Sequence, residues 1–291
     1  MPPGSIAVIG AGTMGRGIAR TALRHGFGVA LFDLNADAVR RVAQAVAADA
    51  ASADAASADA AAGGSALVVA SSVADALDGA EAVIEAVVES EPAKTAVLSE
   101  VARAAGPDTL LATNTSTFSI ARLAAASGCA GRLVGMHFFN PVEKMRLVEV
   151  VVADGVPDRY VQRATGLAEA LGKTPVVVKD SPGFITSRLG LLLGTEAMRL
   201  VSSGVATPDA VDVAMRLGYN HPMGPLELAD LVGLDARLNN LNALYPALDD
   251  DRYRPPQILI DLVSAGHLGR KSGRGFYLYD ADGRKAGVAP Q

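Results

Sequence analysis

A histidine and a glutamate stand twelve residues apart, each inside an apolar segment. His137 ends the run that begins at Leu133, so we expect it at the carboxyl end of a strand, where open α/β sheets bind ligands. Glu149 is the one carboxylate in the run 147–152, and burying it without a partner would be costly. An imidazole is a suitable partner, because a carboxylate fixes its tautomer and stabilises the imidazolium that forms on proton uptake. The pair predicts a general base; the alternative is a core histidine beside an unrelated glutamate.

Three glycines near the N-terminus have the spacing of a phosphate-binding turn. Gly10, Gly12 and Gly15 form G-x-G-x-x-G directly between an apolar strand at 6–9 and a helical segment. The first allows a tight turn, the second lets the backbone approach a pyrophosphate, and the third lets helix and strand pack closely. The helix N-terminus then offers free N–H groups and a favourable dipole to the phosphates. The spacing therefore predicts a dinucleotide site.

An acidic residue follows the second expected strand. Asp33 closes the run 29–32 and comes eighteen residues after Gly15. A carboxylate at this place can accept hydrogen bonds from an adenosine ribose, and it would repel a 2′-phosphate. No arginine follows it directly, although Arg40 and Arg41 lie farther along. We therefore expect NAD rather than NADP.

The composition narrows the class of protein. A chain of 291 residues, half of them hydrophobic, predicts two domains of about 100–200 residues each. The net charge of −5 argues against a nucleic-acid binder, and Cys129, the single cysteine, excludes an internal disulfide and a cysteine-rich metal site. The longest apolar helical run, 189–201, is too short for a membrane span and contains Glu196. Because a strand already begins at Ile6, no secretory signal fits before it, and we expect a cytoplasmic protein.

Apolar strands alternate with helical segments through residues 1–180. This alternation predicts a Rossmann-type, doubly wound and mostly parallel sheet with helices on both faces. After the Pro182-Gly183 pair, helical periodicity dominates, which predicts an all-α domain over 181–291. The expected strands are 6–9, 29–32, 67–69, 82–88, 109–112, 133–138, 147–152 and 176–178.

One segment has an unusual composition. Residues 36–64 are mostly alanine, contain A-S-A-D-A twice in tandem at 51–60, and have no lysine. Alanine favours helix, so we expect an exposed helix or helical hairpin. Its small side chains would bury little surface, which predicts a mobile insertion. A functionless low-complexity insertion is the alternative.

Further motifs follow in a fixed order along nearly the whole chain. They are I-x-V-I-G-A-G-T-M-G at 6–15, E-A-V-V-E at 85–89, N-T-S at 114–116, H-F-F-N-P-V at 137–142, D-S-P-G-F at 180–184, P-M-G-P at 222–225 and G-R-K-S-G-R-G-F-Y at 269–277. In this order they closely resemble the 3-hydroxyacyl-CoA dehydrogenases, in particular the short-chain 3-hydroxybutyryl-CoA type of bacteria. The resemblance implies a Rossmann domain that carries a helical hairpin, followed by a helical domain that dimerises.

The resemblance also implies roles for single residues. His137 would be the general base that removes the proton of the substrate's 3-hydroxyl as hydride moves to NAD, and Glu149 would orient it. Ser116 would hydrogen-bond the substrate oxygen near C3, and Asn140 would contact substrate or nicotinamide. A positioned base with hydrogen-bond donors suffices, because NAD accepts the hydride. The positions that match the cofactor site are Gly10, Gly12, Thr13, Met14, Gly15, Asp33, Glu89, Lys94, Asn114 and Lys271.

Several of these residues have simpler interpretations. Lys94 and Lys271 could be solvated surface charges, since lysines are mostly exposed. Ser116 could cap the helix that follows it, alone or in addition to a catalytic role. Asn140 could be a turn residue before Pro141.

The chain departs from the family pattern in two places. Many members read P-G-F-x-x-N-R, whose asparagine joins the catalytic cluster, whereas Ser187 stands there in this chain. A serine hydroxyl has a shorter reach, so we expect activity with a shifted substrate preference. The family hairpin usually carries lysine, but Arg40 and Arg41 are the only cations of residues 36–64. We therefore expect this segment to bind the 3′-phospho-ADP group of coenzyme A only weakly.

Three functions remain in competition. The first is NAD-dependent interconversion of a short-chain 3-hydroxyacyl-CoA thioester, by default 3-hydroxybutyryl-CoA, and the 3-oxoacyl-CoA. The second is the same chemistry on an acyl group carried by an acyl carrier protein in a biosynthetic pathway. The third is a catalytically silent NAD-binding protein, which the change at Ser187 favours and the presence of His137, Glu149 and Ser116 disfavours. A homodimer is expected because symmetric dimers are the commonest oligomers; the helix 189–201 is either its interface or part of its own domain's core.

Overall fold

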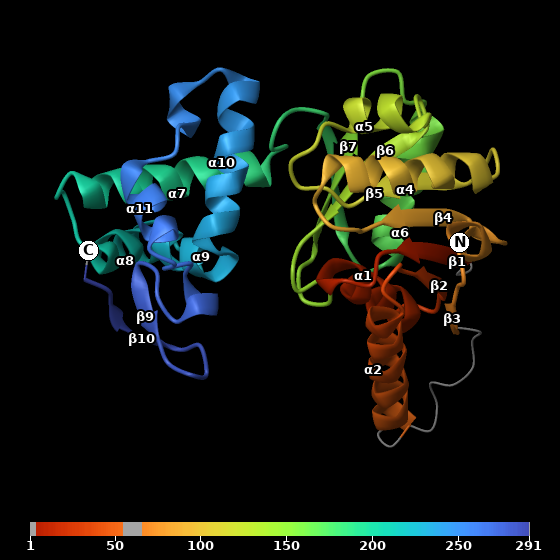
Figure 1. Ribbon diagram of the computed structural model, residues 1–291, viewed down its shortest axis with the longest axis horizontal. Coiled ribbons are helices and arrows are strands. Elements are labelled where there is room, and N and C mark those ends of the chain that lie inside the picture. The colour runs from red at the N-terminus through yellow and green to blue at the C-terminus, as the bar shows by residue number, and fades with distance from the viewer. Residues whose placement is uncertain (1–3, 55–65, 291) are drawn as a thin grey trace. The chain divides into compact units, whose positions relative to one another are not determined.

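The computed structural model describes residues 4–54 and 66–290 of the chain. The chain divides into two compact units, Met1–Phe184 and Ile185–Gln291. Of the alanine-rich segment, α2 (Ala36–Asp54) is one helix that projects from the first unit (Figure 1). The rest of the expected insertion, including the last residue of the first A-S-A-D-A repeat and all of the second, lies outside the described residues.

The first unit is built on one eight-stranded sheet with the order β3-β2-β1-β4-β5-β6-β7-β8. Strands β1 to β6 are parallel, β7 runs antiparallel to β6, and β8 is parallel to β7. The strands are β1 (Ser5–Ile9), β2 (Gly28–Phe32), β3 (Leu67–Val69), β4 (Ala82–Glu85), β5 (Leu110–Thr113), β6 (Leu133–Phe138), β7 (Leu147–Val152) and β8 (Thr174–Lys179). The helices besides α2 are α1 (Thr13–Arg24), α3 (Val73–Leu77), α4 (Glu91–Ala104), α5 (Ile120–Ser127) and α6 (Asp158–Ala170). The mostly parallel Rossmann-type sheet that the sequence predicts is confirmed.

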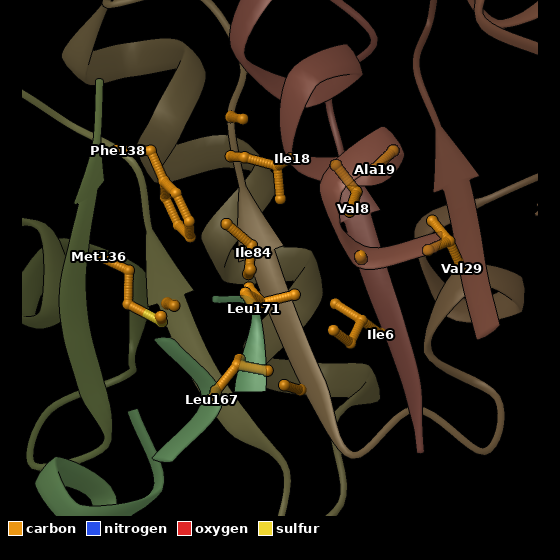
Figure 2. Close-up of a cluster of buried hydrophobic side chains, with 14 of the residues drawn as sticks. Ile6, Val8, Ile18, Ala19, Val29, Ile84, Met136, Phe138, Leu167 and Leu171 are labelled. Carbon is orange, nitrogen blue, oxygen red and sulfur yellow. The ribbon is translucent and has the colours of Figure 1, made fainter. Parts of the chain in front are cut away.

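The two faces of the sheet have separate cores, because successive strand residues point to opposite sides. Figure 2 shows part of one core, in which Ile6, Ile84 and Met136 of the sheet meet Ile18 of α1 and Leu167 of α6. The opposite face packs against α3, α4 and α5. The edge strands β3 and β8 are largely exposed. Since the strands between them are covered on both sides, their sequences are almost continuously apolar. A polar residue inside one of them therefore requires a specific partner.

The second unit is helical, as the sequence predicts. Its elements are α7 (Thr186–Ser202), α8 (Pro208–Gly218), α9 (Pro225–Val232), α10 (Leu234–Leu248), η1 (Asp251–Tyr253), α11 (Gln257–Ser264) and η2 (Arg270–Ser272). A short antiparallel pair, β9 (Tyr277–Tyr279) and β10 (Lys285–Val288), completes it. The prediction of an all-α domain missed this pair, because both strands are short and every residue of β10 is exposed, which leaves no apolar pattern.

Two buried aspartates connect the last two motifs of the sequence within this unit. Asp212 accepts hydrogen bonds from the N–H groups of Leu226 and Glu227, both at 2.8 Å, and from the Tyr277 hydroxyl at 2.7 Å. Asp230 accepts the N–H groups of Phe276 and Tyr277 at 3.0 Å. Burial raises the pKa of Asp230 to about 6, although these hydrogen bonds oppose the shift. The start of α9, directly after the motif at 222–225, and the end of the motif at 269–277 are thus tied to the same helical core by these two carboxylates.

No helix among residues 4–54 and 66–290 combines the length and the apolar character that a membrane span requires.

Candidate active site

The glycine-rich turn joins β1 to α1 where the strand order reverses between β1 and β4, the place at which doubly wound sheets bind ligands. Gly10 has φ +115°, and a Cβ there would lie 2.5 Å from the carbonyl oxygen of Ala86. A Cβ on Gly15 would lie 1.8 Å from the Gly10 carbonyl oxygen, so helix and strand meet too closely for a side chain. Nothing lies within 4 Å of a Cβ at Gly12. The backbone at Gly12 is thus open to a phosphate, and the turn fits a dinucleotide.

Asp33 is fixed directly beside this turn. Its Oδ2 accepts the N–H of Ala11 at 2.7 Å, and its Oδ1 accepts the N–H of Asn35 at 2.7 Å. Each carboxylate oxygen can accept more than one hydrogen bond. The Asp33 carboxylate is therefore held in place and retains capacity for the hydroxyls of a ribose.

His137 and Glu149 are brought together by the reversal of the chain between β6 and β7. The antiparallel register places the two residues directly opposite each other. His137 Nδ1 lies 2.7 Å from Glu149 Oε2, with 8% of the histidine and none of the glutamate exposed. Since a carboxylate can only accept, Nδ1 carries the shared proton and Nε2 is left as the basic nitrogen. The two residues are thus partners in the fold, and their role as a general base stays a prediction.

Two aromatic rings border the His137 imidazole. The ring of Phe139 lies 4.4 Å from it and that of Phe184 5.9 Å, measured between centroids. Phe184 belongs to the D-S-P-G-F motif, whose Asp180 accepts the Ser119 hydroxyl at 2.8 Å and the N–H of Ala121 at 2.9 Å. The motif therefore anchors a ring beside the histidine and fastens the start of α5.

The loop after β5 gathers around one carboxylate oxygen. Glu89 Oε1 accepts the hydroxyl of Thr115 at 2.6 Å, the N–H of Ser116 at 3.0 Å and the hydroxyl of Thr117 at 3.0 Å. The hydroxyl of Ser116 is also turned toward it, at 3.4 Å. Asn114 at the start of this loop accepts the N–H of Phe138, at 2.9 Å, which ties the loop to β6. The loop that carries Ser116 is thus attached to the strand that carries His137.

Ser116 does not cap the following helix, contrary to one interpretation of the sequence. The capping oxygen of α5 is that of Ser119, which accepts the N–H of Arg122 at 3.3 Å. Asn140 is exposed in the turn after β6, so the interpretation of this residue as a turn residue agrees with its place in the fold.

Lys94 is fully buried, so its interpretation as a surface charge is wrong. Its Nζ lies 2.9 Å from Glu85 Oε1 and 3.3 Å from Glu89 Oε2. Burial by itself would raise the pKa of Glu89, but the Lys94 charge and the hydrogen bonds from Thr115, Ser116 and Thr117 lower the pKa below its ordinary value. Glu89 therefore stays ionised and remains a hydrogen-bond acceptor.

A second buried lysine, which the sequence analysis did not single out, holds the connection between β6 and β7. Lys173 Nζ donates to the carbonyl oxygens of Val142 and Met145. Val142 in turn packs against Gly17 of α1, where a Cβ would lie 2.8 Å from the valine methyl. The connection that carries Asn140 is thus fixed between the cofactor helix and Lys173. No local pattern marks Lys173, because its partners are distant in sequence.

Two expected site residues belong to the second unit. Ser187 is the second residue of α7. Lys271 lies in η2 and pairs with Asp235 at 2.6 Å, with half of its side chain exposed. Their roles at the site stay predictions.

Known proteins share this chain's sequence and fold over nearly their full lengths. Residues 5–181 match the family model for the NAD binding domain of 3-hydroxyacyl-CoA dehydrogenase, and residues 183–279 match that for its C-terminal domain. The chain is 42% identical to a probable 3-hydroxybutyryl-CoA dehydrogenase of Bacillus subtilis, covering 94% of this chain and 97% of the relative. It is 39% identical to the 3-hydroxybutyryl-CoA dehydrogenase of Bradyrhizobium diazoefficiens, covering 94% of each.

A solved structure agrees in fold as well. The crystal structure of (S)-3-hydroxybutyryl-CoA dehydrogenase from Ralstonia eutropha matches with a TM-score of 0.86 and 38% identity, over 95% of this chain and 99% of that one. Together with the glycine turn, Asp33 and the two family models, this similarity shows that the chain belongs to the NAD-dependent 3-hydroxyacyl-CoA dehydrogenase family.

Proposed function

We propose that the protein interconverts a short-chain 3-hydroxyacyl-CoA, by default 3-hydroxybutyryl-CoA, and the corresponding 3-oxoacyl-CoA. The observation that carries the proposal is the buried pair of His137 and Glu149, 2.7 Å apart. NAD supplies the acceptor for the hydride that leaves C3. His137 Nε2 removes the proton of the 3-hydroxyl, and Glu149 stabilises the imidazolium that results. In the reverse direction the imidazolium returns the proton to the carbonyl oxygen.

Ser116 has a hydroxyl suited to the substrate oxygen. Because ionised Glu89 only accepts hydrogen bonds, the Ser116 O–H points toward Glu89. That contact is long, at 3.4 Å, so the Ser116 O–H can turn from Glu89 and donate to the substrate oxygen, whose own proton goes to His137. We propose that Asn140 contacts the substrate or nicotinamide, and that the cofactor contacts Gly10, Gly12, Thr13, Met14, Gly15, Asp33, Glu89, Asn114 and Lys271.

The test is oxidation of NADH with acetoacetyl-CoA, followed at the NADH absorbance band. The wild-type protein should oxidise NADH, and the rate with NADPH should be lower, because Asp33 repels a 2′-phosphate. His137→Asn should lower kcat by about two to four orders of magnitude while NADH still binds. Equal rates for wild type and the variant would refute the proposal and favour a catalytically silent NAD-binding protein.

One feature of α2 favours the carrier-protein alternative. Of the two cations in the described part of the alanine-rich segment, Arg40 is already paired with Asp37. The remaining cation, Arg41, would be a weak anchor for the nucleotide of coenzyme A. The same acyl group on an acyl carrier protein is therefore assayed in parallel. A kcat/KM with the free coenzyme A thioester that equals or exceeds that with the carrier would count against this alternative.

We further propose that the second unit contributes to substrate binding and forms a homodimer through α7 and α9. These helices pack against each other and carry exposed apolar side chains, as interaction surfaces do. Those side chains are Leu189, Leu193, Leu228, Leu231 and Val232. Leu189→Lys should convert a dimer to a monomer in light scattering, whereas Leu217→Lys, at an exposed position of α8, should leave it unchanged. A cytoplasmic location stays a prediction.

A further inference from the structure

Glu85, the last residue of β4, is a carboxylate with no exposed surface. Its Oε1 accepts the N–H of Val87 at 2.7 Å and the ammonium of Lys94 at 2.9 Å. Its Oε2 accepts the hydroxyl of Thr113 and lies 3.2 Å from the same ammonium. A buried charge of this kind persists only where it is paired and hydrogen-bonded. Glu85 opens the E-A-V-V-E motif and ends an apolar strand, as Glu149 interrupts one.

The Lys94 ammonium is surrounded by acceptors of this chain and has no exposed surface. Besides Glu85, it contacts Glu89 Oε2 at 3.3 Å and the carbonyl oxygen of Asn114 at 3.5 Å. Lys94 is therefore a buried counter-ion between two carboxylates, which differs from the direct cofactor contact that the resemblance implies.

Glu89 is the partly exposed end of this chain of charges, with 37% of its side chain accessible. Its other oxygen holds the loop 115–117 through Thr115, Ser116 and Thr117. The series of contacts thus runs from Glu85 at the end of β4, through Lys94 of α4, to the loop that carries Ser116. None of these three charged residues contacts His137.

We propose that Glu85 is a positioning residue, which fixes Lys94 and through it places Glu89 and the Ser116 loop for reaction. The proposal rests on the proposed function and deepens it. Glu85 itself touches neither substrate nor cofactor. Its carboxylate fixes the position of the Lys94 ammonium. Lys94 is attracted to both Glu85 and Glu89, and this attraction fixes the position of Glu89. A purely structural role for Glu85 is the competing explanation, and a double-mutant cycle separates the two.

Each single variant removes one charge. Glu85→Gln keeps the shape of the side chain, and Lys94→Gln keeps a polar side chain. Glu85→Gln leaves Lys94 paired with Glu89 alone, and kcat should fall by about 10- to 100-fold because the Ser116 loop moves. The dissociation constant for NADH should rise by a smaller factor than kcat falls, since Glu85 itself makes no cofactor contact although Glu89 does. Lys94→Gln leaves the buried Glu85 and the partly exposed Glu89 without a counter-ion and should lower the melting temperature most.

The double variant Glu85→Gln/Lys94→Gln is the decisive protein. It removes both charges of the buried pair, so its melting temperature should recover well above that of Lys94→Gln. Its kcat should stay low, because Glu89 has lost its counter-ion. If kcat recovers together with the melting temperature, Glu85 has a structural role only and the proposal is wrong.

A readout at Glu89 keeps the test independent of turnover. In Glu85→Gln the pKa of Glu89 should fall further, since Lys94 is left to pair with Glu89 alone, and carbon NMR of the labelled carboxyl measures this directly. The charged groups nearest to Glu89 are Lys94 and, behind it, Glu85, while Glu91 of α4 and Arg122 of α5 form their own pair at 2.6 Å. An unchanged pKa would overturn the proposal even if the wild type proved inactive with every thioester.

Glu91→Gln is the matched control. It removes a carboxylate from the same helix, also from an ion pair, but one whose arginine is largely exposed. Exposed pairs of this kind contribute little, so kcat, NADH binding and the pKa of Glu89 should all stay at their wild-type values. A wild type without activity would refute the proposed function. A Glu91→Gln variant with less activity than an active wild type would instead refute the claim that Glu85 has a specific role.

Discussion

Replacing Glu149 by glutamine tests the catalytic pair most directly. The substitution keeps the size of the side chain and one oxygen acceptor for the Nδ1–H of His137, so the ring orientation can persist. What it removes is the negative charge opposite the imidazolium that forms when His137 takes the substrate proton. The expected result is therefore a loss of rate with little loss of folded protein.

The magnitude follows from the separation of the two charges. With about 4 Å between charge centres and an effective dielectric constant of about 20, the attraction is about 4 kcal/mol. Each 1.4 kcal/mol or so of barrier is a factor of ten, so a complete loss corresponds to about a thousandfold. The glutamine dipole retains part of the interaction, and we expect kcat to fall by about 100- to 1000-fold.

The assay is steady-state NADH oxidation with saturating acetoacetyl-CoA, with the dissociation constant for NADH measured by fluorescence. Glu169→Gln, at an exposed position of α6, is the control for loss of one carboxylate and should behave like wild type. A Glu149→Gln variant that stays folded, binds NADH and keeps more than about a third of the wild-type kcat would refute the assignment of this pair as the base.

Three further predictions follow from buried groups elsewhere. Lys173→Met leaves two backbone carbonyls without their buried donor, so kcat should fall and the free energy of unfolding, measured by denaturant titration, should drop by about 1–3 kcal/mol. Lys179→Met, at an exposed position, should change neither quantity. Because the folded-state pKa of Asp230 is raised from 3.8 to about 6, its stabilising contribution is complete below about pH 4 and is lost as the pH rises through 6. Wild type should thus lose up to about 3 kcal/mol more than Asp230→Asn over this range, and equal pH slopes would contradict the assignment. Gly15→Ala places a Cβ on the Gly10 carbonyl oxygen, so NADH binding should be lost in a fluorescence titration, whereas Gly166→Ala in α6, where a Cβ meets nothing, should bind normally.

Much of the site was predictable because its signals are local. The strand that precedes Gly10 and the spacing to Gly15 define a turn whose geometry depends on residues next to one another in the chain. The cost of burial predicts the pairing of His137 with Glu149, because each apolar strand contains a group that burial without a partner would penalise. The same argument applied to Glu85 would have predicted a buried partner for it, but could not have said which cation that partner was.

The sequence by itself thus determined the class of fold, the dinucleotide turn and the need for a buried histidine–carboxylate pair, since periodicity, glycine spacing and the cost of burial act over a few residues. Only the tertiary structure decided that β7 reverses against β6 and sets Glu149 opposite His137. It also decided that Lys94 is a counter-ion without exposed surface, and that Lys173 fixes a loop about thirty residues away. The physical reason is that register and burial depend on contacts between segments distant in sequence. The exposed fraction of a charged side chain is decided only when those segments have packed around it.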